Sequence, residues 1–370
     1  MSSAPAPAAL TDAGGLAALC AGLEAAPRVA LDTEFMRERT YLAELALLQL
    51  ATPAGIVLVD PLAGLDLAPL AALLADPART KVLHAARQDL EVLLPRLGRP
   101  LAPVLDTQLA AALLGMPAQI GYGDLVERAL GIRLEKGHAR TDWLRRPLSA
   151  AQLAYASDDV RYLLPLAAEL EEQLDRRGRL EWLRADCAAL ADPALYRIDP
   201  ALAWQRLKGI ESLPPREQLR LRSLARWREE RALRRNLPRG WVLTDEGLRS
   251  IARAAPAGRA ELKALRALPD SAADKLGGEI LEALAGAARE PLDGVEQRAD
   301  ARPDAAEQAR TRRLAERLRG MATDLGIAAE VLATQRELRR LARGETLESV
   351  IEGWRRELIG AALAEELARG

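Results

Sequence analysis

The sequence predicts an α/β domain followed by two small all-α modules, and three observations support this fold class. Up to about residue 195, Leu- and Val-rich runs that suit strands are mixed with helical patterns. From about residue 200 the strand patterns stop, and helical patterns alternate with Pro and Gly. A break rich in Pro, Asp and Gly, "REPLDGVEQRADARPDAA", divides the helical part. We therefore expect domains at 1–198, 199–285 and 305–370, with a linker at 286–304.

The strands come first in the chain. The runs that predict them are "VALDTEF", "ELALLQLAT", "GIVLVDP" and "TKVLHAA". Because links as short as "TPAG" join the first three runs, we expect an antiparallel meander at this point.

Helical patterns follow in "DLEVLLPRL", "DTQLAAALLG" and "YGDLVERALG", and the last of these ends on a Gly that suits a C-cap. A single longer helix is expected in "PLSAAQLAYASDDVRYLLPLAAELEEQL", where Ser149 and Gln152 form a capping-box pattern. We expect Asp106 in "LDTQ" to be an N-cap, and His84 to be a structural hydrogen-bonding residue.

The composition excludes several classes of protein. The 370 residues carry a formal net charge of −1, so nucleic-acid contacts must come from local patches. Cys20 and Cys187 match no disulfide framework or metal spacing, and with only His84 and His138 a His-based metal cluster is not expected. We find no signal peptide and no apolar run that would span a bilayer, so we expect a soluble, cytoplasmic protein without membrane contact.

Two carboxylates interrupt the first long strand, Arg28–Phe35. Alternate side chains of a strand share a face, so Asp32 and Glu34 lie together on one side with Ala30. Two like charges near a core lose hydration and repel one another, which is unfavourable unless a positive charge compensates. Apart from Arg28 the strand has no Lys or Arg, so the partners must lie elsewhere in the chain.

Two other segments supply acids that pair with this strand. Asp89 in "HAARQD" follows a strand and begins a helix, and in "YASDDV" Tyr155 and Asp159 are spaced to share one helix face. Oxygen ligands without His or Cys suit Mg²⁺ or Mn²⁺, so we expect two divalent metal ions to supply the missing charge and to support phosphodiester cleavage. Taken singly, Asp89 also suits an N-cap, Asp159 a solvated helix charge and Tyr155 a packing residue. Their joint occurrence favours the metal site.

The motifs "DTEF", "HAARQD" and "YASDD" resemble the three exonuclease motifs of the DEDDy 3′–5′ exonucleases, which have a ribonuclease H-like fold with a mixed sheet. Longer segments, such as "LDTEFMRERTYLAELALLQLA", "TDWLRRPLSAAQLAYASDDVRYLLPL" and "GWVLTDEGLRSIA", are similar to bacterial ribonuclease D. This resemblance covers nearly the whole chain. Both helical modules are similar to HRDC domains.

The resemblance implies a role for each motif residue. Asp32 would bridge both metal ions, and Glu34 and Asp159 would complete the first metal site. Asp89 would hold the second ion, partly through water. Tyr155 would orient the attacking water, with Glu34 as the other hydrogen-bond partner of that water.

Contacts with nucleic acid are expected from basic residues and one tryptophan. The segment "PREQLRLRSLARWREERALRRNLPR" suits either a solvated helix face or a phosphate-tracking patch, in which Trp227 stacks on a base. Our candidates there are Arg220, Arg226 and Trp227. Arg140 in "KGHARTDW" is a further candidate, although Ala139 stands where the family usually has Gln.

These patterns lead to one main functional hypothesis and two alternatives. The main hypothesis is a hydrolase, a metal-dependent 3′–5′ exoribonuclease, that trims RNA with a single-stranded 3′ end and releases nucleoside 5′-monophosphates. The resemblance adds tRNA precursors as substrates. The alternatives are a 3′–5′ DNA exonuclease and a non-catalytic nucleic-acid-binding adapter. No G-x-x-x-x-G-K-[ST] motif is present, so no ATP is expected as a partner.

Overall fold

The computed structural model describes residues 7–134, 137, 141–210, 213–292 and 304–369. They form two compact units. The first unit comprises Met1–Met36, Glu44–Tyr196 and Asp304–Gly370, and the second comprises Arg37–Ala43 and Arg197–Pro303. The domain boundaries expected from the sequence remain predictions. No helix in the described ranges has both the length and the apolar character needed to cross a membrane.

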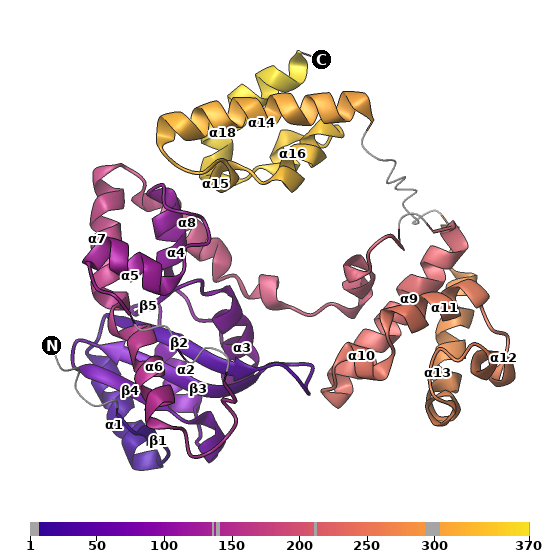
Figure 1. The fold of residues 1–370 in the computed structure, drawn as a ribbon, viewed down its shortest axis with the longest axis horizontal. Coiled ribbons are helices and arrows are strands. Elements are labelled where there is room, and N and C mark those ends of the chain that lie inside the picture. Colours follow the sequence, from indigo (N-terminus) through magenta and orange to yellow (C-terminus); the bar gives the residue numbers. More distant parts are fainter. Residues whose placement is uncertain (1–6, 135–136, 138–140, 211–212, 293–303, 370) are drawn as a thin grey trace. The chain divides into compact units, whose positions relative to one another are not determined.

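A six-stranded mixed sheet forms the centre of the first unit, as far as the chain is described (Figure 1). Its strand order is β1-β4-β3-β2-β5-β6, and β2 pairs antiparallel with β3 but parallel with β5. The strands are β1 (Ala9–Leu10), β2 (Arg28–Met36), β3 (Glu44–Thr52), β4 (Gly55–Val59), β5 (Thr80–Leu83) and β6 (Val104–Asp106).

The antiparallel meander predicted from the short links is confirmed, because β3 pairs antiparallel with both β2 and β4. The sequence did not predict β1 and β6. These strands have two and three residues, which is too short for a pattern of alternating side chains to be recognised.

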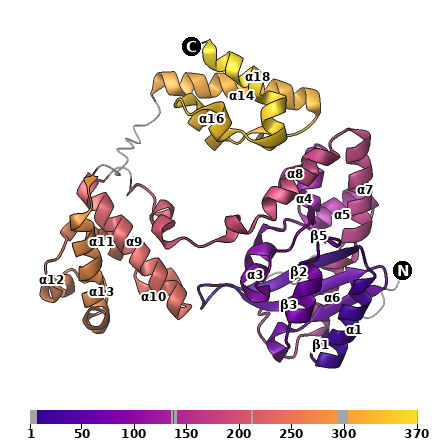
Figure 2. The same cartoon turned by 180° about the vertical axis from the view of Figure 1, so that it is seen from behind.

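Eight helices accompany the sheet in the described part of the N-terminal segment. They are α1 (Ala13–Glu24), α2 (Ala68–Leu74), α3 (Arg87–Leu97), α4 (Thr107–Leu113), α5 (Tyr122–Leu130), α6 (Ala150–Arg161), α7 (Leu163–Arg176) and α8 (Leu180–Leu190), with the 3₁₀ turns η1 (Pro61–Ala63) and η2 (Pro193–Tyr196). Helix α6 packs against β2, β3 and β4, and α3 lies beside β2 in both ribbon views (Figure 1, Figure 2). These two helices bring side chains to the central strand.

The prediction of one long helix after Ser149 is wrong, although the capping box of Ser149 is confirmed. The helix is divided into α6 and α7 at Tyr162. At the division, the Tyr122 hydroxyl donates to the Asp158 carbonyl at 3.1 Å and accepts from the Tyr162 N–H at 3.2 Å. These two backbone groups would bond to each other in a continuous α-helix, so the inserted hydroxyl interrupts the hydrogen-bond ladder.

The C-terminal helices also belong to the first unit and dock on α8. Trp354 stacks on Trp182 with ring centroids 4.3 Å apart, and its Nε1 donates to Asp186 at 3.0 Å. Arg355 donates to both carboxylate oxygens of Asp186, at 2.6 and 2.8 Å. The helices are α14 (Ala305–Leu325), α15 (Ala329–Leu332), α16 (Gln335–Ala342), α17 (Leu347–Val350) and α18 (Gly353–Ala368).

In its described residues the second unit is all-α, apart from the segment Arg37–Ala43, which packs on its helices. The backbone N–H groups of Tyr41 and Leu42 donate to Asn236 Oδ1 at 3.1 and 3.0 Å, and the Tyr41 hydroxyl donates to Glu229. The helices of this unit are η3 (Pro200–Arg206), α9 (Pro215–Arg235), α10 (Arg239–Val242), α11 (Asp245–Ala254), α12 (Arg259–Ala264) and α13 (Asp270–Arg289).

Helices α9–α13 and α14–α18 repeat one architecture. Both sets begin with a 21-residue helix that ends on a left-handed residue, Asn236 in one and Gly326 in the other, 90 residues later. A helix of four residues follows in each set. The next helix is N-capped by Thr244 or by Thr334, again 90 residues apart. The expectation of two all-α modules after the α/β domain is therefore confirmed.

Candidate active site

The central strand β2 carries two half-buried acidic side chains. Asp32 lies opposite Gln49 of β3, and Glu34 lies opposite Leu47. The pairing register shifts directly after Glu34, and such a bulge bends a strand and re-aims its side chains. The predicted placement of both carboxylates on one face of a buried strand agrees with this register.

Helix α6 supplies a third acid to the same place. Carboxylate oxygens of Asp32, Glu34 and Asp159 all lie within 4.8 Å of one another. Tyr155 is one helical turn before Asp159, and its hydroxyl donates a hydrogen bond to the Asp159 carboxylate. The structure thus brings together four of the five motif residues that the sequence singled out.

Burial and mutual repulsion disfavour the charged forms of these acids. Burial raises the pKa of Asp32 well above its ordinary value, and the charges of Asp89, Asp159 and Glu34 raise it further. Burial and the charges of Asp159 and Asp89 raise the pKa of Glu34 to about 9. Burial and the charge of Asp158 raise the pKa of Asp159 to about 7. At neutral pH the cluster therefore retains protons unless a cation compensates.

Asp89 lies near this cluster but outside the group of three. Its Oδ1 accepts a hydrogen bond from Thr33 Oγ1 at 2.5 Å, and burial raises its pKa to about 7. The alternative interpretation of Asp89 as an N-cap is wrong, because it lies in the first turn of α3 and Ala86 occupies the cap position. Hydrogen bonding to Thr33 ties α3 to the strand of Asp32 and Glu34.

The loop before α3 is held by Asp106, as its predicted capping role suggests. The Asp106 carboxylate caps α4 by accepting from the Gln108 N–H at 2.7 Å. It also accepts from the N–H groups of Ala85 at 3.1 Å and Ala86 at 2.8 Å. His84 bonds to Thr107 Oγ1 at 2.9 Å, so its expected structural role is confirmed too.

The Tyr155 ring is positioned by packing. The ring centroid of the buried Trp143 lies 6.1 Å from that of Tyr155, with the planes tilted by 40°. Burial raises the pKa of Tyr155, and the nearby charges of Asp159 and Glu34 raise it further. The hydroxyl therefore keeps its proton and acts as a hydrogen-bond donor at neutral pH.

The donor set fits a divalent cation. All three side chains of the group offer carboxylate oxygens, which hard cations such as Mg²⁺ and Mn²⁺ prefer. Within the described ranges, no Lys or Arg forms an ion pair with Asp32, Glu34 or Asp159. The compensating charge sought from the sequence is thus absent from the described protein residues themselves, and a bound cation would meet this need.

Gln49 is a site residue that the sequence did not single out. It lies directly opposite Asp32, is fully buried, and neither polar atom of its amide has a partner among the described residues. A buried amide without partners is unfavourable, so Gln49 should cost stability at this position when no ligand is bound. The sequence feature that could have identified Gln49 is its position as a single polar residue within the apolar run "ELALLQLAT".

The candidates for RNA contact require one correction. Trp227 is 8% exposed and its Nε1 donates to Glu279 at 2.8 Å, so a base has no free face of this indole on which to stack. Arg226 is exposed and forms an ion pair with Glu230 at 2.9 Å. Arg220 is half-buried. Arg140 lies outside the described residues.

Comparisons with known proteins identify the family of this chain. A family model described as 3′–5′ exonuclease matches residues 7–175, and one described as HRDC domain matches residues 217–284. Ribonuclease D of Acidiphilium cryptum (strain JF-5) is 41% identical over 366 residues, which is 97% of this chain and 92% of that protein. Ribonuclease D of Escherichia coli (strain K12) is 35% identical over 365 residues, which is 96% of each.

A solved structure extends the likeness to three dimensions. The crystal structure of Escherichia coli RNase D, described as an exoribonuclease involved in structured RNA processing, matches with a TM-score of 0.88 and 34% identity. The match covers 97% of this chain and 98% of that one. The predicted ribonuclease H-like exonuclease domain followed by HRDC-type helices is therefore confirmed, and the chain belongs to the bacterial ribonuclease D family of 3′–5′ exoribonucleases.

Proposed function

We propose that this chain trims single-stranded 3′ ends of RNA, including tRNA precursors, one nucleotide at a time by metal-dependent hydrolysis. The observation that carries the proposal is the convergence of the carboxylates of Asp32, Glu34 and Asp159 within 4.8 Å, with Tyr155 bonded to Asp159. A cluster of this kind is unfavourable in an idle protein because its members repel one another. A non-catalytic adapter would have no use for it.

Two divalent cations are the cofactors we propose. Asp32, Glu34 and Asp159 would hold one of them, and Asp32 and Asp89 would hold the other. Bound divalent cations supply positive charge that polarises the scissile phosphate and lowers the pKa of water. The acids themselves would be fully ionised once this charge is present, because each raised pKa returns toward its ordinary value.

Tyr155 and Glu34 would position the attacking water. The Tyr155 hydroxyl remains protonated and already donates to Asp159, so its oxygen can accept a hydrogen bond from water. Ionised Glu34 would accept a second hydrogen bond from the same water. Together they would aim one lone pair of the water at phosphorus, with the 3′ oxygen as the leaving group and a nucleoside 5′-monophosphate as the product.

The experiment uses the full-length chain and two substrates of matched sequence, RNA and DNA, each labelled at its 5′ end and single-stranded at its 3′ end. With Mg²⁺ or Mn²⁺ the RNA should shorten stepwise from the 3′ end and release nucleoside 5′-monophosphates, and EDTA should stop the reaction. A tRNA precursor with a 3′ extension should be trimmed in the same way. Faster degradation of the DNA would contradict the RNA assignment, and binding without any cleavage would indicate an adapter.

A further inference from the structure

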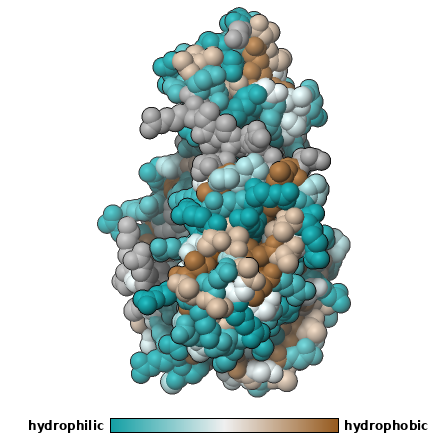
Figure 3. All heavy atoms as spheres, turned by 90° about the vertical axis from the view of Figure 1, so that its right-hand side faces the viewer, coloured by the Kyte–Doolittle hydropathy of each residue, from teal (hydrophilic) through white to brown (hydrophobic). Residues whose placement is uncertain are grey.

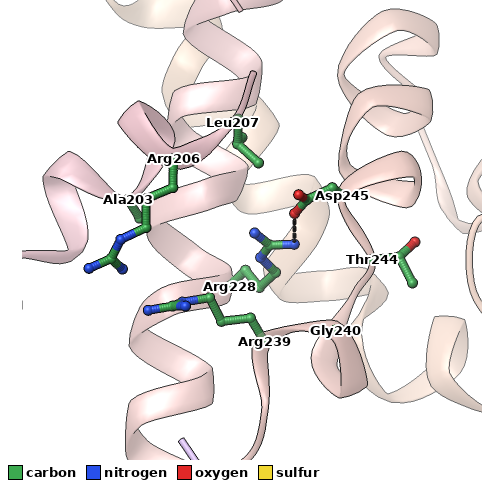
Figure 4. Close-up of a pocket in the computed structure, with 8 residues that line it drawn as sticks. All are labelled: Ala203, Arg206, Leu207, Arg228, Arg239, Gly240, Thr244 and Asp245. Atoms are coloured by element: carbon green, nitrogen blue, oxygen red, sulfur yellow. Dashed lines mark hydrogen bonds and ion pairs between the residues drawn. The ribbon is translucent and has the colours of Figure 1, made fainter. Parts of the chain in front are cut away.

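The second unit contains a pocket of about 400 Å³ whose walls carry three arginines (Figure 4). It lies where η3, α9, α10 and the start of α11 meet. Its lining consists of Ala203, Arg206, Leu207, Arg228, Arg239, Gly240, Thr244 and Asp245. All of these residues belong to the second unit, so the pocket does not depend on the rest of the chain.

Arg228 is the buried cation of this pocket. It is 5% exposed, and its Nη1 donates to the Leu243 carbonyl at 2.8 Å and to Asp245 Oδ1 at 2.7 Å. Its Nε is buried and has no acceptor among the residues that the structure describes. In Figure 4 its guanidinium lies between the η3 side chains and Asp245. A buried guanidinium N–H without an acceptor is unfavourable, and an anion bound near this guanidinium would offset part of that cost through its charge.

Arg206 and Arg239 share one buried carboxylate, Glu229. Arg206 Nη1 donates to Glu229 Oε1 at 2.8 Å, and Arg239 donates to Oε2 at 2.6 Å and to Oε1 at 3.0 Å. With Arg228 and Asp245 included, three cations face two anions. The pocket therefore keeps an excess positive charge, and a guanidinium has five N–H groups, more than these contacts use.

The second helical module shows that the fold does not require these arginines. Ninety residues after Arg228 and Arg239, the equivalent positions are Leu318 and Ala329, and both line a pocket of about 240 Å³ there. Leu318 is as well buried as Arg228. The pocket in the second module is lined by one Arg and one Glu, whereas the pocket in the first has three Arg and one Asp, so the excess of cations is particular to the first module and points to a ligand there.

An exposed indole follows the pocket wall directly. Trp241 comes after Gly240 and is 64% exposed, whereas Val331, 90 residues later, is buried. Among the large hydrophobic side chains in the described ranges, Trp241 is the most exposed. Hydrophobic and hydrophilic residues are interspersed on the face of the molecule that Figure 3 shows. From Arg231 to Thr244 the chain has four Arg and no acid. Cations beside an exposed aromatic ring suit single-stranded RNA better than an apolar protein surface.

We propose that the arginine pocket binds a backbone phosphate of single-stranded RNA, with Arg206, Arg228 and Arg239 as donors and Trp241 as the stacking platform for an adjacent base. This site rests on the proposed function, because its ligand is part of the same RNA substrate. In this proposal Trp241, and not the sequence-based candidate Trp227, is the aromatic residue that contacts RNA. The helical module would hold nucleotides that are not being cleaved, so it would contribute to affinity and not to the chemical step.

The test measures binding of a labelled oligouridine RNA to the full-length protein in EDTA, over about 50 to 200 mM salt. Arg206→Gln removes an exposed donor while Glu229 keeps Arg239 and Tyr41 as partners. Arg228→Leu introduces the residue type of the equivalent position in the second module. Arg253→Gln is the matched control, because Arg253 is exposed in the same unit but does not line the pocket.

Each pocket variant should bind about tenfold more weakly, since a charge-assisted hydrogen bond is lost. Each should also flatten the dependence of log affinity on log salt by about 0.7, the value for one phosphate contact on a single strand. Arg253→Gln should match the unaltered protein. Trp241→Ala should weaken binding at least about fivefold, and Trp241→Phe should retain most of the affinity because it keeps an aromatic face.

Unaltered affinity and salt dependence in both pocket variants would overturn the proposal, as would an equal loss in the Arg253→Gln control.

Uridine 5′-monophosphate serves as a second probe. If it occupies the pocket as tightly as the RNA does, the pocket takes free nucleotides and the RNA assignment is wrong. Because binding is measured without metal, the result is separate from cleavage. A protein that binds as expected but never cleaves would contradict only the proposed function.

Discussion

At the scale of single residues, the proposed chemistry depends on acids that the protein places in an unfavourable electrostatic environment. Asp32 has Glu34 beside it on the same strand and Asp159 facing it from α6, and partial burial removes some of the water around all three. The raised pKa values are therefore a consequence of geometry. Such a cluster is suited to bind cations, because each bound positive charge would remove repulsion that folding has already imposed.

Tyr155→Phe removes one hydroxyl and leaves the ring packed against Trp143. We expect turnover to fall by about 10- to 1,000-fold, the range of groups that position water or handle protons. Affinity for Mn²⁺ should change little, since Tyr155 contributes no carboxylate. The measurement is single-turnover cleavage together with a Mn²⁺ titration. Full activity in this variant would show that Tyr155 only packs.

Gln49→Met removes two buried polar atoms that have no partner in the described structure. Without metal, we expect the variant to gain about 1 kcal/mol of unfolding free energy or more, because the cost of the unsatisfied amide disappears. Gln152→Met is the control. The Gln152 amide donates to Thr141 Oγ1 at 3.1 Å, so its removal should lower the free energy of unfolding. Urea denaturation compares the two. Equal destabilisation in both would mean that a water or ion satisfies Gln49.

Some of these residues were predictable from the sequence and others were not. Carboxylates within an apolar strand are conspicuous because burial makes them costly, so Asp32 and Glu34 were readily found. Trp227 was misjudged because a helix rich in Arg does not reveal which face packs inward. Gln49 was passed over because one amide carries no charge. Burial and partners, which decide all these cases, depend on contacts distant in sequence.

At the scale of secondary-structure elements, local patterns predicted the long strands and most helices but not their interruptions. The Tyr122 hydroxyl, which takes part in the division between α6 and α7, is 36 residues before Asp158. Pro165 was a local signal for the division that the prediction overlooked, because a proline within a helical pattern removes a backbone hydrogen-bond donor. Two related helical modules were expected, but the exact 90-residue correspondence between α9–α13 and α14–α18 was not, because the two modules share cap positions and helix lengths more than residue types.

Trp354→Ala tests how the C-terminal helices attach. Trp354 stacks on Trp182 and bonds to Asp186, so we expect a loss of about 3–5 kcal/mol, the range for deleting a buried tryptophan. The measurement is urea denaturation, with limited proteolysis to detect release of α14–α18. Trp241→Ala is the matched control because Trp241 is exposed and its loss should change stability little. Similar effects of the two substitutions would contradict the docking shown here.

At the scale of the whole molecule, the grouping of the chain could not be inferred from sequence order. Asp304–Gly370 belongs to the same compact unit as the exonuclease domain, while Arg37–Ala43, taken from between two strands, belongs to the other unit. The Trp182–Trp354 and Asp186–Arg355 contacts join residues about 170 positions apart, and local periodicity carries no information at that separation.

The stability of the whole protein should depend on pH through the acid cluster. The folded pKa is about 9 for Glu34 and about 7 for Asp89 and Asp159, whereas unfolded carboxylates titrate near 4. Between these values the folded state binds more protons, so stability in EDTA should fall as pH rises from about 4 to about 9. Mn²⁺ should reduce this fall. Urea midpoints across this range, with and without Mn²⁺, provide the measurement, and a stability that rises with pH would contradict the cluster's electrostatics.

The central claim is that the Asp32 cluster holds the divalent cations that support RNA cleavage, and one comparison of two variants tests it most directly. Asp32→Asn removes one carboxylate of the cluster, whereas Asp158→Asn removes a neighbouring carboxylate that pairs with Arg161 at 2.7 Å and lies outside the group of three. Both variants keep side-chain size and lose one charge.

The measurement is the single-turnover rate on a single-stranded RNA with Mn²⁺. We expect Asp32→Asn to lose well over about 100-fold, beyond the loss typical of groups that only support metal ligands, and Asp158→Asn to stay close to the unaltered protein. Comparable rates in Asp32→Asn and the unaltered protein would contradict the claim.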